Sequence, residues 1–276
     1  MRTKQVTARA VWPNAGIKQR YQRRMIALIQ EMANSVLYWL EAQRKASPPV
    51  LAADALPSEQ MRAEVHRLFE QWRKRFEKEA PKIAGAFLRG QFSATNAAMR
   101  QALRDAGWTI EFTLTPAMRD AFEASLAENV GLIKSIPAQY LQEVEGIVMR
   151  NYTAGRDLKS MAQEIRGRYH VAANRAVLIA RDQSNKASAV VQRARQKELG
   201  ITEFQWLHSH AGREPRRTHV AMNGKRFPVN KGAWDADEKA FVFPGQLINC
   251  RCVGRSVLPF SPSGKPANAE AASSRK

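Results

Sequence analysis

The sequence has little cysteine and no long apolar run. Only two of its 276 residues are cysteine, and they lie two positions apart, which excludes a small secreted fold held by several disulfide bonds. No stretch reaches the roughly 18–20 consecutive apolar residues that a membrane helix needs. The basic N-terminal segment MRTKQVTARAVWP lacks the apolar core of a secretory signal. We therefore expect synthesis in a reducing cytosol.

The chain is nevertheless apolar enough to fold. Hydrophobic residues make up 44% of it and aromatic residues 8%, which is ordinary for a globular protein and too high for a disordered one. At roughly 100–200 residues per domain, its length predicts one or two domains. The patterning predicts an α+β protein, with a mostly helical N-terminal and central region followed by a small α+β module of short strands.

Acidic residues are scarce beside basic ones. The chain has 44 Lys and Arg but 25 Asp and Glu, giving a formal net charge of +19, and such a surface attracts polyanions. The sequence has no helix-turn-helix, zinc-finger or RNA-recognition motif, so we expect non-specific contact with double-stranded DNA. A basic surface that only keeps the protein soluble is the alternative. The candidate DNA-contacting residues are Arg20, Arg23, Arg24, Arg213, Arg216, Arg217, Lys225 and Arg226.

Apolar spacing and helix-boundary residues predict the order of elements. We expect an extended arm over residues 1–14, a short strand or extended connector over 108–114, and short strands with one helical turn after Gly200. The predicted helices run from Gly16 to the break at Ser47-Pro48-Pro49, from Ser58, from Pro81 to near Gly107, over about 116–129, 137–153 and 157–168, and from about 172 to Leu199.

These elements group into four predicted regions. They are a helical N-terminal region (1–115), a second helical region (116–200), a small α+β module (201–260) and a disordered polar tail (261–276). Within them we expect Trp206 and Trp234 to be core residues of the small module. Gln183 should be a buried polar group that fixes helix packing.

The Cys250-Arg251-Cys252 segment is the sharpest chemical feature. Residues i and i+2 of a strand point to the same side, so two thiolates there could share a metal ion, whereas a disulfide across one residue would be strained. Histidines at 208, 210 and 219 could complete a tetrahedral site. The candidate ligands of a structural zinc ion are therefore His208, His210, His219, Cys250 and Cys252. Alternatively, the cysteines are small buried apolar side chains and His219 hydrogen-bonds a neighbouring loop.

No catalytic motif accompanies this segment. The chain has no HExxH, no GxSxG and no phosphate-binding glycine loop. A Cys250 nucleophile paired with His219 is conceivable, but such a pair in sequence alone means little. The nearby acidic residues have no spacing tied to a catalytic motif: Glu214, Asp235, Asp237 and Glu238. We predict that the protein is not an enzyme, with a metal-dependent nuclease as the weaker alternative.

Five segments occur in the order found in one known family. They are NVGLIKSIP (129–137), RAVLIARDQSNK (175–186), LGITEFQW (199–206), EPRRTHVAMNGKRF (214–227) and PGQLINCRC (244–252). The ordered set resembles the phage Mu F-like head morphogenesis family, the minor head or minor capsid proteins of tailed phages. The resemblance covers about residues 120–258.

The resemblance implies a structural protein of the procapsid and virion. It implies association with the phage portal protein and with capsid or scaffold components, a place inside the head, and assembly in the host cytoplasm. Many relatives have an acidic residue followed by Arg near the start of the histidine segment. This chain departs from that pattern, because the corresponding stretch reads HAGREPRRTH. A free, non-specific nucleic-acid-binding protein is the alternative. The family's characteristic positions correspond to Arg217, His219, Asn223, Gly224, Pro244, Asn249, Cys250, Arg251 and Cys252.

Overall fold

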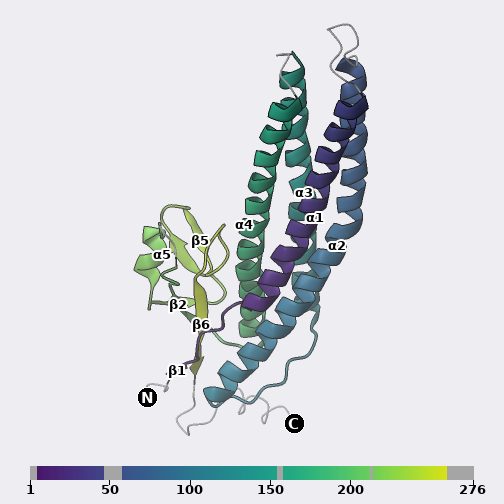
Figure 1. The fold of residues 1–276 in the computed structure, drawn as a ribbon. Coiled ribbons are helices and arrows are strands. Elements are labelled where there is room, and N and C mark those ends of the chain that lie inside the picture. The colour runs from purple at the N-terminus through teal and green to yellow at the C-terminus, as the bar shows by residue number, and fades with distance from the viewer. Residues whose placement is uncertain (1–4, 47–57, 154–157, 212–213, 260–276) are drawn as a thin grey trace. The chain divides into compact units, whose positions relative to one another are not determined.

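The computed structural model describes residues 5–46, 58–153, 158–211 and 214–259. Their order of elements confirms the α+β class, with long helices first and a small antiparallel sheet module last (Figure 1). The helices are α1 (Ala15–Ala46), α2 (Ser58–Asp105), α3 (Pro116–Thr153), α4 (Leu158–Glu198) and α5 (Arg217–Met222). The strands are β1 (Gln5–Thr7), β2 (Glu203–Leu207), β3 (Arg226–Pro228), β4 (Ala233–Asp235), β5 (Ala240–Val242) and β6 (Val253–Pro259).

The chain divides into two compact units, each assembled from separate segments. Unit 1 comprises Met1–Lys18, Phe87–Ser125 and Arg181–Lys276, and unit 2 comprises Gln19–Ala86 and Leu126–Ala180. The region boundaries predicted at residues 115 and 200 stay predictions. The predicted tail (261–276), the start of the N-terminal arm (1–4) and the Pro48-Pro49 break lie outside the described residues. None of the described helices is both long and apolar enough to cross a membrane.

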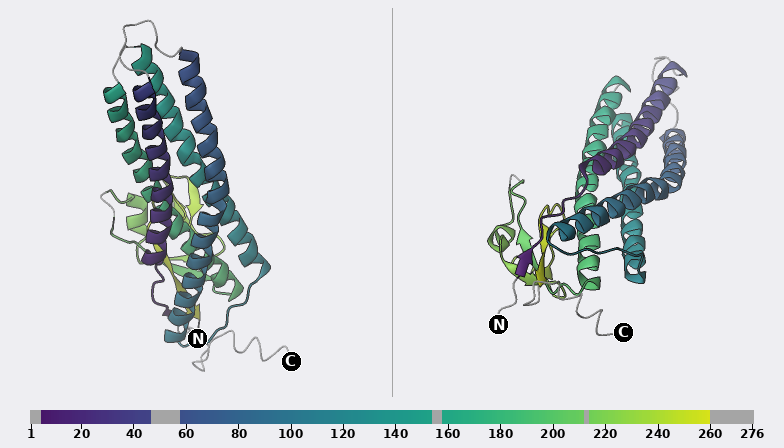
Figure 2. Two further views of the ribbon diagram at one scale, coloured as in Figure 1. Left: turned by 45° about the vertical axis from the view of Figure 1, so that its right-hand side comes forward. Right: turned by 90° about the horizontal axis from the view of Figure 1, so that it is seen from below.

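Unit 2 is formed by segments of α1, α2, α3 and α4 that run side by side (Figure 2). Apolar residues at helical spacing fill its core, as the stripe on the first predicted helix requires. Inside this core the Tyr21 hydroxyl donates a hydrogen bond to Asn129 Oδ1 at 2.9 Å, which satisfies both buried polar groups. Buried core residues include Met25, Ile29, Met32, Val36, Phe76, Ile133, Tyr140, Leu141, Val144 and Ile165.

Two prolines that predicted helix boundaries lie inside continuous helices. Pro81 is inside α2 and Pro137 is inside α3, so the helix start predicted at Pro81 is wrong, and the helices predicted over 116–129 and 137–153 are one. An interior proline costs about 3 kcal/mol. Burying one large apolar side chain returns about 1.5–3 kcal/mol, and residues on both sides of each proline are buried. Tertiary packing therefore overrides the local signal.

The helices predicted over 157–168 and 172–199 are also one helix, α4. Its buried residues Met161, Ile165, Ala172 and Ala176 keep a single helical phase across the predicted gap. The predicted end at Gly200 is confirmed. Gly200 adopts φ +65°, and Ile201 donates its backbone N–H to the Gln196 carbonyl oxygen at 2.9 Å, as in a glycine-terminated helix.

Unit 1 contains a four-stranded antiparallel sheet with strand order β1-β6-β2-β3 and a separate β4-β5 hairpin. The predicted N-terminal arm supplies β1, which pairs with β6 from the other end of the described chain (Figure 2). Residues 108–114 form an extended connector and contain no strand. The sheet therefore joins segments that are about 250 positions apart in sequence, with Gln5 opposite Pro259.

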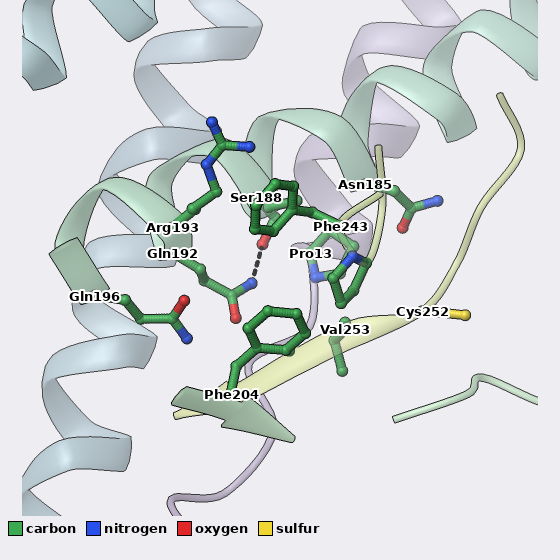
Figure 3. A pocket seen from close by; sticks show the side chains of 13 residues that line it. Pro13, Asn185, Ser188, Gln192, Arg193, Gln196, Phe204, Phe243, Cys252 and Val253 are labelled. Carbon is green, nitrogen blue, oxygen red and sulfur yellow. Dashed lines mark hydrogen bonds between the residues drawn. The ribbon is translucent and has the colours of Figure 1, made fainter. Parts of the chain in front are cut away.

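Polar side chains on the C-terminal part of α4 hold this helix to the sheet and the arm. Gln192 Nε2 donates to the Val11 carbonyl oxygen at 3.1 Å and to Ser188 Oγ at 3.0 Å, and Gln196 Nε2 donates to Ser256 Oγ at 3.0 Å. Figure 3 shows this helix face, where a cavity of about 30 Å³ leaves room for about one or two water molecules. Gln183, on the same helix, is buried as predicted.

The prediction that both tryptophans are core residues is confirmed for Trp206 and wrong for Trp234. Trp206, in β2, is fully buried, but Trp234 is 54% exposed. Trp234 lies opposite Phe241 in the β4-β5 hairpin, and the two rings pack edge to face at 5.1 Å. A two-stranded hairpin has a second face without a neighbouring layer, and alternation along the strand places Trp234 there.

Arg195 provides a test of the packing around α4. It is buried and donates hydrogen bonds to Asn96 Oδ1, the Thr113 carbonyl oxygen and Glu198 Oε2 at 2.9, 2.8 and 2.6 Å. Replacing Arg195 with Ala leaves these three acceptors without their hydrogen-bond donor. We therefore expect the free energy of unfolding, measured in urea, to fall by about 3–5 kcal/mol. Lys197→Ala, an exposed change two positions away, should cost about 0.5 kcal/mol or less. Equal effects of the two changes would contradict the role of Arg195.

Candidate metal centre

Three predicted metal ligands meet in unit 1. His219 is in α5, whereas Cys250 and Cys252 flank Arg251 just before β6. His219 Nδ1 lies 3.5 Å from Cys250 Sγ and 3.7 Å from Cys252 Sγ. All three side chains are buried, and their ligand atoms lie within 4.8 Å of one another.

The C-terminal end of α5 fixes the position of His219. Gly224, just after the helix, adopts φ +78° and donates its backbone N–H to the Trp206 carbonyl oxygen at 2.8 Å. Asn223 Oδ1 accepts a hydrogen bond from the His208 backbone N–H at 2.9 Å. The His219 ring packs edge to face on the buried Trp206 ring at 4.9 Å. The C-terminal end of the helical turn is thus tied to the end of β2, and the imidazole packs on a β2 side chain.

The loop before Cys250 is fixed against α4. Asn249 adopts φ +59°, and its backbone N–H donates to Asp182 Oδ1 at 2.7 Å. Gly245 adopts φ +78°, and a Cβ there would come within 3.0 Å of Ala189 Cβ, so the close approach requires glycine. The Gly245 N–H donates to Cys250 Sγ at 3.3 Å. Backbone geometry therefore aims the first sulfur at His219.

Asp235 lies on the other side of the imidazole. Its carboxylate is fully buried, and its Oδ2 lies 3.3 Å from His219 Nε2. It accepts hydrogen bonds from Thr218 Oγ1 at 3.0 Å and from the backbone N–H groups of Asp237 and Glu238 at 3.0 and 3.4 Å. Burial raises the pKa of Asp235, but these hydrogen bonds outweigh it, and the pKa lies below its ordinary value. Asp235 is therefore an ionised partner of His219.

A thiol–thiol interaction shifts the pKa values of the two cysteines in opposite directions. The Cys252 thiol donates toward Cys250, and despite the opposing effect of burial this lowers the pKa of Cys250 to about 4, with His219 and the Gly245 N–H adding to the effect. The same interaction with Cys250, together with burial, raises the pKa of Cys252. Cys250 is therefore the cysteine that more readily forms a thiolate, the form of cysteine that binds metals and attacks electrophiles.

The centre borders a cleft of about 530 Å³ that contains charges of both signs. His208 is buried and lines this cleft, but its ring nitrogens are not part of the close group formed by His219 and the cysteines. His210 is exposed, and its backbone N–H donates to His208 Nδ1 at 3.2 Å. Further lining residues are Arg181, Ser209, Glu214, Pro215, Arg216, Ile248, Asn249 and Arg251.

The arrangement supports metal binding better than nucleophilic catalysis. In space, the Cys250 sulfur, the His219 imidazole and the Asp235 carboxylate follow one another in the order found in catalytic triads. A nucleophile must also be accessible, and only 3% of Cys250 and 4% of Cys252 is exposed. Two sulfurs beside one imidazole nitrogen form a donor set suited to zinc.

Sequence reasoning found the three converging residues but gave Asp235 no role. Asp235 is one of four nearby acidic residues; it is the last residue of β4 and follows His219 by 16 positions, with β3 between them. No spacing rule connects them, because they belong to different elements, α5 and β4, which tertiary packing brings together. Thr218, which holds Asp235, is next to His219 and carries no separate signal.

The predicted DNA-contacting residues do not form one described surface. Arg20, Arg23 and Arg24 are exposed on α1 in unit 2, whereas the others belong to unit 1. In unit 1, Arg217, Lys225 and Arg226 are exposed, and Arg226 donates to Gln5 Oε1. Arg216 is partly buried and donates to the Ile248 carbonyl oxygen at 3.2 Å. Arg213 lies outside the described residues.

The structural role of the Asp235 carboxylate can be tested by substituting Asp235 and, as a control, the nearby Asp237. Asp235→Ala removes the acceptor for Thr218 and two backbone N–H groups, and we expect the free energy of unfolding to fall by about 3 kcal/mol. Asp237→Ala removes an exposed carboxylate nearby and should change it by about 0.5 kcal/mol or less. Urea denaturation of both variants measures the difference. A wild-type stability for Asp235→Ala would contradict the hydrogen-bond network described above.

Comparisons with known proteins place this centre within a family segment. Residues 142–255 match the family described as Phage Mu protein F like protein. A Haemophilus influenzae protein, named only as an uncharacterized protein, is 36% identical over 144 residues, which is 52% of this chain and 31% of the relative. The chain thus spans about a third of that relative's length. No solved structure matches the chain. The resemblance seen in the sequence is confirmed: residues 142–255, which include His219 and both cysteines, are a phage Mu F-like region.

Proposed function

We propose that this protein acts in phage head morphogenesis as a minor head protein. The observation that carries the proposal is the family match over residues 142–255, which covers the later part of α3, all of α4 and the small module into β6. All nine characteristic positions named above fall inside this segment. The family supplies the structural role, and the geometry of those positions is compatible with it.

Several of these characteristic positions have packing roles. Asn223 accepts from the His208 backbone, Gly224 turns the chain after α5, and Asn249 joins the cysteine loop to α4 through Asp182. Arg251 donates to the Ala211 carbonyl oxygen. Side chains that bind the protein's own backbone hold a particular loop shape, as a docking module needs.

The proposed partners are the portal protein and capsid or scaffold components, and the proposed location is the inside of the head. Support for them comes from the family. The module offers exposed apolar side chains, Val220 of α5 and Ile248 of the cysteine loop, on which a protein partner can pack. Trp234 and Phe241 add a second exposed pair on the hairpin.

We also propose non-specific contact with packaged double-stranded DNA. Arg20, Arg23 and Arg24 share one face of α1 by their i, i+3 and i+4 spacing, and no described carboxylate pairs with them. In contrast, exposed arginines of α2 have acidic partners: Arg62 with Glu145, and Arg73 with Glu70 and Glu77. Unpaired guanidinium groups are available to phosphates without first breaking an ion pair.

This contrast gives a matched test of DNA contact. Arg20, Arg23 and Arg24 are replaced together by Ala, and the control replaces the ion-paired Arg62, Arg67 and Arg73, so both variants lose three positive charges. Binding to a random-sequence duplex is measured against salt concentration. We expect the α1 variant to lower the log–log salt slope by about 2–3, at about 0.9 per phosphate contact, and the control by less than about 1. Equal losses would contradict a contact surface on α1.

The assembly role is tested by co-expression with the portal protein and by the composition of virions. We expect the full chain to co-purify with portal, and to be present in low copy in purified particles after protease treatment of their outside. Absence from both would contradict the proposal. Tight DNA binding without portal binding would favour a free nucleic-acid-binding protein. Cleavage of plasmid DNA with Mg²⁺ or Zn²⁺ would favour the nuclease alternative.

A further inference from the structure

We propose that His219, Cys250 and Cys252 bind a zinc ion in unit 1, with His208 as the fourth ligand. The inference rests on side-chain geometry and is independent of the proposed role in head assembly. The ion would join three segments of the chain: α5, the cysteine loop before β6, and the residues that follow β2.

The distances between donor atoms match a tetrahedral zinc site. With Zn–S about 2.3 Å and Zn–N about 2.0–2.1 Å, tetrahedral angles separate sulfur from nitrogen by about 3.5 Å. The observed separations from His219 Nδ1 are 3.5 Å to Cys250 Sγ and 3.7 Å to Cys252 Sγ. One nitrogen lone pair accepts only one proton, so a thiol–imidazole hydrogen bond accounts for one of these approaches. A shared ion accounts for both.

Asp235 prepares His219 for this role. Its ionised carboxylate lies beside Nε2, which favours the tautomer with the proton on Nε2 and the lone pair on Nδ1, facing the sulfurs. Thr218 and two backbone N–H groups hold the carboxylate in place. Carboxylates placed in this way orient the histidine ligands of many zinc proteins and increase their basicity.

The donor set selects the metal. Thiolate and imidazole ligands favour zinc, whereas magnesium and calcium require oxygen ligands. The positive charge of the ion would balance two thiolates in a buried site. The Gly245 N–H, 3.3 Å from Cys250 Sγ, supports a thiolate there.

We assign the fourth position to His208, whose ring nitrogens lie outside the close group of the other three donors and would have to move toward it. His208 is buried and lines the same cleft as the three other ligands. Its Nδ1 accepts the His210 N–H at 3.2 Å, which leaves Nε2 as the available ligand atom. The His208 backbone N–H donates a hydrogen bond to Asn223 Oδ1. His210 is exposed, so the two neighbouring histidines form a natural pair for comparison.

The first experiment measures metal in the full chain. Protein purified without chelator is assayed by mass spectrometry for metals, and we expect about one zinc per chain. Replacement by Co²⁺ should give sulfur-to-cobalt charge-transfer bands and the intense visible bands of tetrahedral cobalt. A chain that retains no zinc when supplied with it, and that gives only the weak spectrum of octahedral cobalt, would overturn the proposal.

Substitutions then assign the ligands. His208→Ala should weaken zinc affinity in a chelator competition by more than about 100-fold, and Asp235→Asn by about 10–100-fold, whereas His210→Ala should match the wild type. Cys252→Ser should reduce the charge-transfer intensity by about half, because one of two thiolates is lost. Wild-type affinity in His208→Ala would overturn its assignment as a ligand. An unchanged cobalt spectrum in Cys252→Ser would overturn the two-sulfur site.

Discussion

The imidazole of His219 connects a buried carboxylate to a pair of buried sulfurs, and the small module is arranged around that connection. Asp235 lies 3.3 Å from one ring nitrogen, and the sulfurs lie 3.5 and 3.7 Å from the other. An isolated buried carboxylate or thiolate would be costly. Each is instead hydrogen-bonded or placed beside a group of complementary character, so the position of one residue constrains all the others.

The C-terminal part of α4 gives this centre a fixed base. Asp182 accepts the Asn249 N–H and so holds the cysteine loop, while Gln192 and Gln196 hold the N-terminal arm and β6. These groups are polar and buried, and each has a specific partner, which fixes the alignment of helix and sheet more narrowly than apolar contact alone. The phage Mu F-like match includes all of this helix.

Much of the fold could be predicted from the sequence, because local signals and tertiary packing agree. The apolar stripe of α1, the Thr115-Pro116 start of α3 and the Gly200 end of α4 all follow such signals. Pro81 and Pro137 show where local signals fail, because burial on both sides of each proline outweighs its cost. Trp234 shows that residue type alone does not determine burial in a hairpin with one open face.

The candidate centre could be predicted in part for a similar reason. The i, i+2 spacing of Cys250 and Cys252 is a local pattern with a geometric meaning, and His219 is one of three histidines named as candidates beside it. Asp235 and the difference between His208 and His210 depend on how separate segments pack, which no spacing in the sequence records.

X-ray absorption at the zinc edge of the purified full chain tests the central claim most directly, because it reports the atoms around the ion without any substitution. The account predicts two sulfur neighbours at about 2.3 Å and two nitrogen neighbours at about 2.0–2.1 Å. A shell of oxygen and nitrogen atoms without sulfur would contradict it.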